Sequence, residues 1–478
     1  MKIIHKQMHQ QMHQPPLTPP FTRKGYAGGY PAALLRPYLE QGENRTGSSL
    51  VKGRLGGVCL ALCKEQFVGL SSVLIFLLFS MNYIHAHAEE DALNFSADGA
   101  LYGYATSTAL RSDSLLNPDN QLARLPQHTQ TAEARFNFKA ENDNLRLTLR
   151  PILIWQQISN EFGEQVKSEG YVSQGQLRWR MAEAWNVAAG REVMNWGPAQ
   201  FRSPSNPFYF DNGRSNPIRE LSGLDSVKVS WTPDTRYSMS LGYIASSGHY
   251  EGPTDTWRDT WIFRGTSRGM KWAGGVAVAK KEGQQAFVGV DAQYNKSDEL
   301  LLYGEAGSST RPNALQSPAD AAQPFSIEAE SARHLNELVG ATYTLDNGQS
   351  LSVEYLHQGH GFTASEEAAY FERAANATLP AGASTLGMAL ANVPPLLGRN
   401  YVHLVWQNNF LEGDYYWRLM CTRSLTDHGN QLTGYAEMTL SKLVSGFVLG
   451  VLPLGNERQE FSSMIGRLAT AGIKVNLP

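Results

Sequence analysis

Apolar and polar side chains alternate along most of the chain after residue 88. A period of two residues is typical of β-strands with one apolar face, because successive side chains point to opposite sides of a strand. Turn-forming residues, such as Asp346-Asn347-Gly348, separate these segments. The pattern predicts 16–18 strands between residues 93 and 477, and roughly 22 residues per strand and turn give the same number. The clearest strands are 145–150, 176–181, 227–231, 351–355 and 402–406.

The connections between these segments alternate in length. Long connections are expected near 156–170, 194–223, 246–258, 311–332 and 363–398, with short ones between them. Antiparallel strands joined in this way have tight turns at one end and long loops at the other, as outer-membrane barrels do. The sequence therefore predicts an all-β fold, a transmembrane antiparallel up-and-down β-barrel of 16–18 strands.

A soluble β-sandwich, propeller or solenoid is the alternative fold. Propellers and solenoids repeat with a fixed period of about 20–50 residues, and no such repeat stands out in this chain. The second face of the strands is rich in Arg, Lys and Glu, where a sandwich core would need apolar groups. Aromatic residues near strand ends suit the interfacial girdles of a membrane barrel. They are Trp155, Trp179, Trp231, Trp406 and Trp417.

A secretory signal peptide is predicted before the barrel. The uncharged apolar run 68–79 follows Arg54 and Lys64, and Ala86-His87-Ala88 supplies a cleavage site after Ala88. An uncleaved N-terminal anchor is the alternative. The chain thus divides into an N-terminal extension at 1–50, disordered or the product of a misplaced translation start, a signal peptide at 51–88 and a barrel at 89–478.

Composition narrows the class of protein further. The 478 residues carry a formal charge of −3, and removal of residues 1–88 changes it to −9. This charge gives no general reason to expect nucleic-acid binding. Cys421 is the only cysteine outside the leader, so the exported part has no internal disulfide.

Charged residues occupy the face of the strands that is not apolar. If the apolar face meets lipid, the other face lines the lumen. A cationic row on one wall, here called the basic ladder, would oppose an acidic wall, and such charged rings select ions in pores. The alternative is a structural network of ion pairs without a role in conduction. The basic ladder consists of Arg135, Lys139, Arg146, Arg150, Arg178, Arg180, Arg191 and Lys228, and the acidic wall of Asp291, Glu305, Glu354 and Glu437.

The long connection at 194–223 is the best candidate for a loop that folds into the lumen. It carries four prolines and the large aromatic residues Phe201, Phe208, Tyr209 and Phe210, and an external loop normally needs fewer large apolar groups. Its cations Arg202, Arg214 and Arg219 would then join the basic wall at a constriction. A capped extracellular loop is the alternative. Residues 366–375, in another long connection, predict a short helix that could serve as a lid or plug.

Catalytic, metal and cofactor motifs are weak in this chain. Gly265-Thr266-Ser267-Arg268-Gly269 fits G-x-S-x-G, which indicates a nucleophile elbow only between a strand and a helix. His357 and His360 lack further metal ligands at a suitable spacing. An outer-membrane hydrolase would need a His beside an acid, for which His403 and Glu437 are the closest pair. We therefore expect no enzyme activity, catalytic residue, metal or cofactor.

The segment Gly190-Arg191-Glu192-Val193-Met194-Asn195-Trp196-Gly197, followed by Ser203-Pro204-Ser205-Asn206-Pro207-Phe208, resembles a turn of Gram-negative outer-membrane barrels. It is similar to one in poorly characterised porin-like proteins and, more faintly, in capsule-assembly barrels. The resemblance covers about thirty residues and implies a membrane barrel but no particular substrate. It also implies that a cationic row opposite acidic residues could form a constriction.

These observations predict a porin-like channel in the outer membrane of a Gram-negative cell. It would admit small hydrophilic solutes, anionic ones by preference, through passive diffusion. A polysaccharide export or assembly barrel is the main alternative. The expected partners are outer-membrane lipid and small anionic solutes, without nucleic acid, and a homotrimer is an assembly that the sequence allows.

Overall fold

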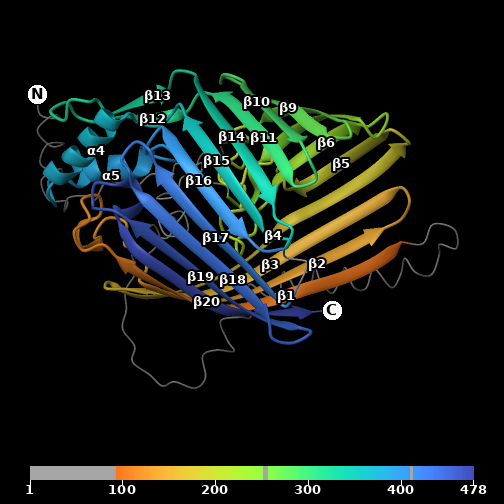
Figure 1. The fold of residues 1–478 in the computed structure, drawn as a ribbon, viewed down its shortest axis with the longest axis horizontal. Helices are drawn as coiled ribbons and strands as arrows, with labels where there is room; N and C mark the ends of the chain where they lie inside the picture. Colours follow the sequence, from red (N-terminus) through yellow and green to blue (C-terminus); the bar gives the residue numbers. More distant parts are fainter. Residues whose placement is uncertain (1–92, 251–256, 410–412, 478) are drawn as a thin grey trace, which may run out of the picture.

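The strands form one antiparallel sheet that closes on itself, since the first strand pairs with both the second and the last (Figure 1). The structure, a computed structural model, describes residues 93–250, 257–409 and 413–477. The predicted extension at 1–50 and the signal peptide at 51–88 lie outside the described residues. Within these residues the barrel has 18 strands, which confirms the predicted fold at the upper end of its range.

The barrel strands follow one another around the ring in chain order. They are β1 (Asn94–Leu110), β2 (His128–Glu141), β3 (Leu145–Asn160), β4 (Gly163–Ala182), β5 (Trp185–Glu192), β6 (Leu224–Trp231), β7 (Tyr237–Ser246), β8 (Thr260–Arg268), β9 (Trp272–Lys281), β10 (Phe287–Asn295), β11 (Leu300–Ser309), β14 (His334–Thr344), β15 (Ser350–Gln358), β16 (Asn400–Gln407), β17 (Tyr415–Ser424), β18 (Asn430–Thr439), β19 (Val444–Leu454) and β20 (Ile465–Leu477). A separate hairpin of β12 (Pro312–Gln316) and β13 (Ser326–Glu330) lies in one long connection.

The long connections all lie at one end of the barrel, which we call the loop end, and the connections at the other end, the turn end, are all short. The long connections at 193–223, 247–259, 310–333 and 359–399 agree with the predicted ones. The expected long connection at 156–170 is wrong, because β3 and β4 continue to a turn at 161–162. Its strands are polar on both faces, as expected of a hairpin that rises out of the lipid into water. This part of the hairpin therefore lacks the alternation that marks the other strands.

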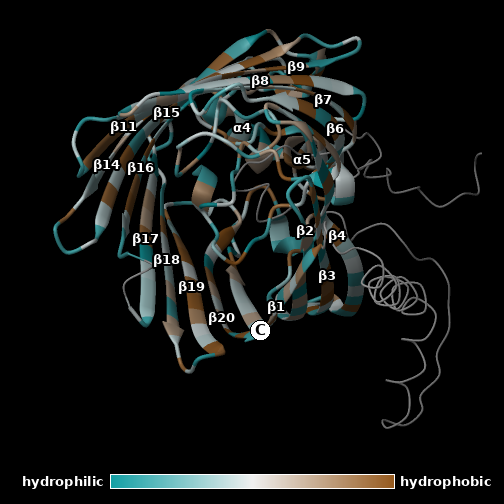
Figure 2. Cartoon of the chain, turned by 90° about the vertical axis from the view of Figure 1, so that its right-hand side faces the viewer, coloured by the Kyte–Doolittle hydropathy of each residue, from teal (hydrophilic) through white to brown (hydrophobic). Residues whose placement is uncertain are grey.

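The apolar residues of the strands face outwards. Leu147, Leu177 and Val227 have exposed fractions of 40, 44 and 54 %, so they do not pack in a dry interior. Figure 2 shows the resulting stripes of hydrophobic and hydrophilic residues along the strands around the ring. Near the turn end the exposed side chains include Trp179, Trp185, Trp272, Trp406 and Tyr415. A lipid-facing band with an aromatic girdle is typical of outer-membrane barrels.

Two helices cover part of the loop end, away from the C terminus (Figure 1). They are α4 (Ala364–Asn376) and α5 (Ala383–Asn392), so the helix predicted at 366–375 is confirmed. The Thr363 side chain begins α4 with a capping box that includes Glu366. Both helices pack with β12 and with Leu116, Phe325 and Met464 in one apolar cluster, and we call this assembly the cap. Three short 3-10 turns complete the described elements: η1 (Pro118–Asn120), η2 (Gly248–Tyr250) and η3 (Glu460–Ser462).

Of the helices in the part of the chain that the structure describes, none has the length and apolar character needed to cross a membrane.

Candidate functional site

The connection between β5 and β6 folds into the barrel and docks on two buried acids of the opposite wall. The Glu305 carboxylate accepts hydrogen bonds from the Ala199 backbone N–H at 2.9 Å and from the Ser203 and Ser205 hydroxyls at 2.6 and 2.7 Å. Glu354 accepts the backbone N–H groups of Gln200 and Phe201 at 2.6 and 2.8 Å. We call residues 194–223 the infolded segment.

Small residues on the wall allow this close approach. A Cβ on Gly307 would lie 1.9 Å from the Pro204 carbonyl oxygen, and one on Gly289 would lie 2.3 Å from that of Ser205. Within the segment, Gly197 has a φ of +91°, a conformation that glycine adopts without strain. The wall of β10 and β11 is therefore shaped to receive the segment backbone.

The other end of the infolded segment contacts the far side of the barrel. Arg135 on β2 donates to the Ile218 carbonyl at 2.7 Å and lies 3.8 Å from Glu220. Ser173 on β4 donates to Glu220 at 3.1 Å. Around the ring, β2 lies opposite β11 and β4 opposite β15. The segment thus crosses the lumen from wall to wall and narrows it.

The arginines of the infolded segment have different surroundings. Arg202 is fully buried, 3.7 Å from Asp211, and Arg219 lies 3.1 Å from the same carboxylate. Burial opposes ionisation of Asp211, but these two guanidinium groups hold the pKa of its carboxyl below its ordinary value. Arg214 donates to the carbonyls of Pro198 and Ala199. Arg202 therefore acts inside the segment and presents no charge to water.

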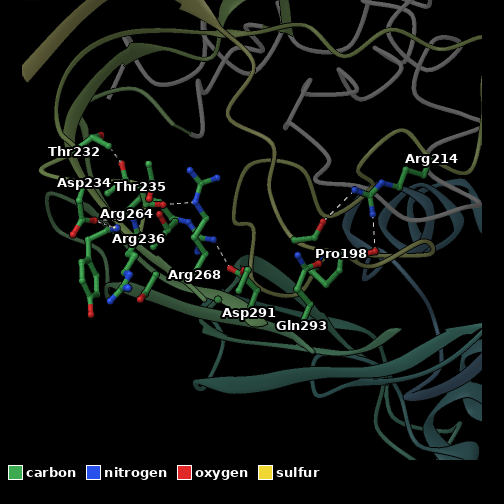
Figure 3. Close-up of a pocket in the computed structure, with 17 residues that line it drawn as sticks. Pro198, Arg214, Thr232, Asp234, Thr235, Arg236, Arg264, Arg268, Asp291 and Gln293 are labelled. Atoms are coloured by element: carbon green, nitrogen blue, oxygen red, sulfur yellow. Dashed lines mark hydrogen bonds and ion pairs between the residues drawn. The ribbon is translucent and has the colours of Figure 1, made fainter. Parts of the chain in front are cut away.

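A polar cavity of about 460 Å³ lies between the infolded segment and strands β7 to β10, on the side of the turn end (Figure 3). We call it the arginine cavity. Asp234 and Asp291 are its acidic lining residues, and Arg264 pairs with Asp291 at 2.5 Å while lying 5.0 Å from the Trp196 ring. Its basic lining residues are Arg214, Arg236, Arg264 and Arg268.

A second cavity, of about 390 Å³, shares Thr232 and Ser238 with the arginine cavity. We call it the ladder cavity, because four members of the predicted basic ladder line it: Arg146, Arg178, Arg180 and Lys228. Asp143 is the acidic residue in its lining. A third cavity, of about 420 Å³, lies on the loop side of the segment, against Pro204, Pro207 and Phe210.

The other predicted ladder residues lie apart from the ladder cavity. Arg135 pairs with Glu133 at 2.8 Å beneath the infolded segment, and Arg191 pairs with Asp225 at 2.7 Å. Arg150 donates to Asn137 at 3.1 Å, and Lys139 stands in register with Thr148. The structure thus brings half of the predicted ladder together and places the rest in local contacts.

The four residues of the predicted acidic wall have different surroundings. Glu305 and Glu354 have exposed fractions of 4 and 1 %, so the infolded segment covers them, where the sequence led us to expect an open, hydrated wall. Asp291 lines the arginine cavity, and Glu437 accepts a hydrogen bond from the Tyr435 hydroxyl at 2.7 Å. Sequence alternation finds which wall a residue belongs to, but it cannot reveal what covers that wall.

Glu192 is a functional candidate that the sequence analysis missed. Its carboxylate binds the Lys228 ammonium and the Gln176 amide, and it lies 3.9 Å from Arg178. Extending the alternation of β5 from Ala188 through Gly190 would have placed it on the lumen side. Arg236 and Arg268 were missed because they lie in and beside short turns, where the strand pattern is brief. Arg264 lies in the middle of β8, and its alternation with the exposed Trp261 and Phe263 would have placed it on the lumen side.

Among the described residues, no three His, Cys, Asp or Glu side chains come together as a metal site. The G-x-S-x-G sequence lies mostly within β8, a strand without a following helix. His403 shares a hydrogen bond of 2.8 Å with the Thr422 hydroxyl and stacks on Phe201, whereas Glu437 accepts a hydrogen bond from Tyr435.

No protein-family model and no curated protein match this chain. Solved structures do share its fold. OccAB1 of Acinetobacter baumannii is 9 % identical with a TM-score of 0.50, over 82 % of this chain and 98 % of that chain. OccK11 (OpdR) of Pseudomonas aeruginosa is 11 % identical with a TM-score of 0.49, over 82 and 98 %. Together with the lipid-facing band, this fold identifies the chain as an outer-membrane β-barrel of porin-like architecture.

Proposed function

We propose that this protein is a porin-like channel through which small, hydrophilic, anionic solutes diffuse passively across the outer membrane. An 18-strand barrel has a lumen too wide for side chains of its wall to fill, so water enters it. The infolded segment leaves polar cavities on the side of the turn end. Together these features support a narrowed aqueous path.

The proposed preference for anions rests on the excess of positive charge in the arginine cavity and the ladder cavity, which adjoin. Eight cationic side chains line the arginine cavity and the ladder cavity, against three acidic ones. A charged lining raises the local concentration of the opposite ion, and rings of cations are how pores favour anions. A wide, open lumen would instead have favoured the polysaccharide alternative, and the infolded segment argues against it.

Planar-bilayer recordings in asymmetric KCl test this proposal. The reversal potential of the purified, refolded protein should indicate preference for chloride over potassium. Replacing Arg146, Arg178 and Arg180 together with Gln should reduce the chloride preference several-fold, because three of the four cations of the ladder cavity lose their charge.

Turn lysines provide a control with the same change of net charge. Lys271, Lys296 and Lys442 are exposed in turns and line neither cavity, so their triple Gln variant should keep the wild-type reversal potential. A cation-selective wild type, or equal effects of the two triple variants, would contradict the proposal.

Glu192→Gln should shift selectivity in the opposite direction. Glu192 neutralises Lys228 and stands near Arg178, so its removal exposes positive charge to the lumen. A Gln side chain still accepts a hydrogen bond from Lys228, and we expect the barrel to remain folded. The chloride preference should rise about two- to threefold at low salt and less at high salt, because salt screens the charge. An unchanged reversal potential at low salt would place Glu192 outside the ion path.

A further inference from the structure

Three acidic side chains from three different connections meet beneath the cap at the loop end. Glu367 comes from α4, Asp427 from the connection between β17 and β18, and Glu460 from η3. Glu367 and Glu460 have exposed fractions of only 2 and 1 %. Like charges in such a place repel strongly, because little water is present to screen them.

Two of these acids accept hydrogen bonds from the described residues, and the third does not. Asp427 accepts the backbone N–H groups of Gly429 and Glu460 at 2.8 and 2.6 Å. Glu460 accepts the Leu397 backbone N–H at 3.0 Å and the Tyr401 hydroxyl. Within the part of the chain that the structure describes, neither oxygen of Glu367 accepts a hydrogen bond. A buried carboxylate without donors is costly, whereas a protonated carboxyl can itself donate to a neighbouring acid.

Two arginines of the cap and of the connection that follows it have other partners. Arg399 lies 3.7 Å from Glu366 and donates to the Gly361 carbonyl at 2.9 Å. Arg373, on the same helix as Glu367, donates to Ser317 at 2.8 Å and to backbone carbonyls of the connection at 318–323. No ion pair with Glu367, Asp427 or Glu460 occurs among the described residues, so protonation of one of the acids lowers the repulsion among them.

We propose that a proton on Glu367, donated to the Asp427 carboxylate, latches α4 and with it the cap onto the rim of the barrel, and that the latch loosens as pH rises. Loss of this proton places an ionised carboxylate next to Asp427 and Glu460 under the apolar cluster. Separation of α4 from the rim then relieves the repulsion and hydrates the acids. The cap is therefore a pH-sensitive lid.

The direction of the pH effect follows from linkage. Burial, reinforced by Asp427 and Glu460, raises the pKa of Glu367 well above its ordinary value, and burial raises the pKa of Glu460 to about 8. The closed cap therefore binds more protons than the open cap. Closure is fully favoured below the ordinary carboxyl pKa of about 4.5 and weakens as pH rises towards the raised values. Between pH 4.5 and the raised pKa values, each of these two acids can increase the fraction of molecules with an open cap up to about tenfold per pH unit.

Thiol labelling of the cap measures its opening. Ala374 lies in the apolar cluster with an exposed fraction of 2 %, so a cysteine placed there reacts with a maleimide only when α4 moves. Ala374→Cys would be made in full-length protein that also carries Cys59→Ser, Cys63→Ser and Cys421→Ser, with and without Glu367→Gln. Rates compared at one pH cancel the pH dependence of the thiol itself. We expect equal rates near pH 5 and, at pH 8, labelling at least tenfold faster in the protein that retains Glu367.

Glu372→Gln is the matched control, because Glu372 is exposed on the same helix and its loss should leave the labelling profile unchanged. Glu367→Met, neutral and of similar length, repeats the test with a different side chain, and heat-modifiable gel migration verifies the folded barrel. Labelling rates that remain equal at pH 8 with and without Glu367→Gln would overturn the latch. The readout involves no solute, so its failure would leave the proposed channel function untouched.

Discussion

Replacement of residues 197–222 by a short turn should raise the single-channel conductance several-fold. The infolded segment crosses the lumen, and an 18-strand barrel without it has an interior far wider than its side chains can fill. The chloride preference should fall at the same time, because ions in a wide pore pass farther from the charged walls. Conductance and reversal potential in planar bilayers measure both effects.

The deletion is compatible with a folded barrel, because the two strand ends that the segment connects are already neighbours. Glu192 and Leu224 are paired across β5 and β6, so a turn of a few residues can join them. Gly307→Val offers an independent route, since its side chain would collide with the Pro204 carbonyl and displace the segment.

Gly304→Ala is the control for the glycine variant. It lies on the same strand, and a Cβ there would come no closer than 3.4 Å to its neighbours, so its conductance should equal that of the wild type. If the deletion variant conducted like the wild type, the segment would not be the main obstruction of the lumen.

The sequence predicted the barrel because the membrane imposes one rule on every strand. Each lipid-facing position must be apolar, so Leu147, Leu177 and Val227 report the strand face without knowledge of their neighbours. The rule stops where the lipid stops, and this explains the error at 156–170, where a polar hairpin continues into water.

The site was less predictable, because it depends on contacts between residues far apart in the chain. The composition of 194–223 favoured an infolded loop, but only the structure shows Glu305 and Glu354 beneath it. Four cations of the ladder line one cavity, whereas Arg135 and Arg191 have acidic partners nearby in space. Alternation thus shows which side chains point into the lumen, but it does not show which cations have acidic partners. The conducting role of the ladder stays a prediction.

Removal of both docking acids should release the infolded segment without opening the barrel wall. Glu305→Ala with Glu354→Ala deletes the acceptors of four backbone N–H groups and of the Ser203, Ser205 and Tyr303 hydroxyls. A hydrogen bond to a charged group is worth about 1.5–3 kcal/mol, and buried donors left without partners add to the cost, so loss of several such bonds should weaken docking strongly.

Single-channel traces distinguish release from simple loss of charge. The double variant should switch among several conductance levels, with the upper ones approaching the deletion variant, because the tethered segment leaves and re-enters the lumen. Glu437→Ala removes an acid of the same wall that contacts Tyr435 and not the segment, so it should keep a single level. A steady wild-type level in the double variant would mean that Gly289, Gly307 and the contacts to Arg135 and Ser173 hold the segment without the acids.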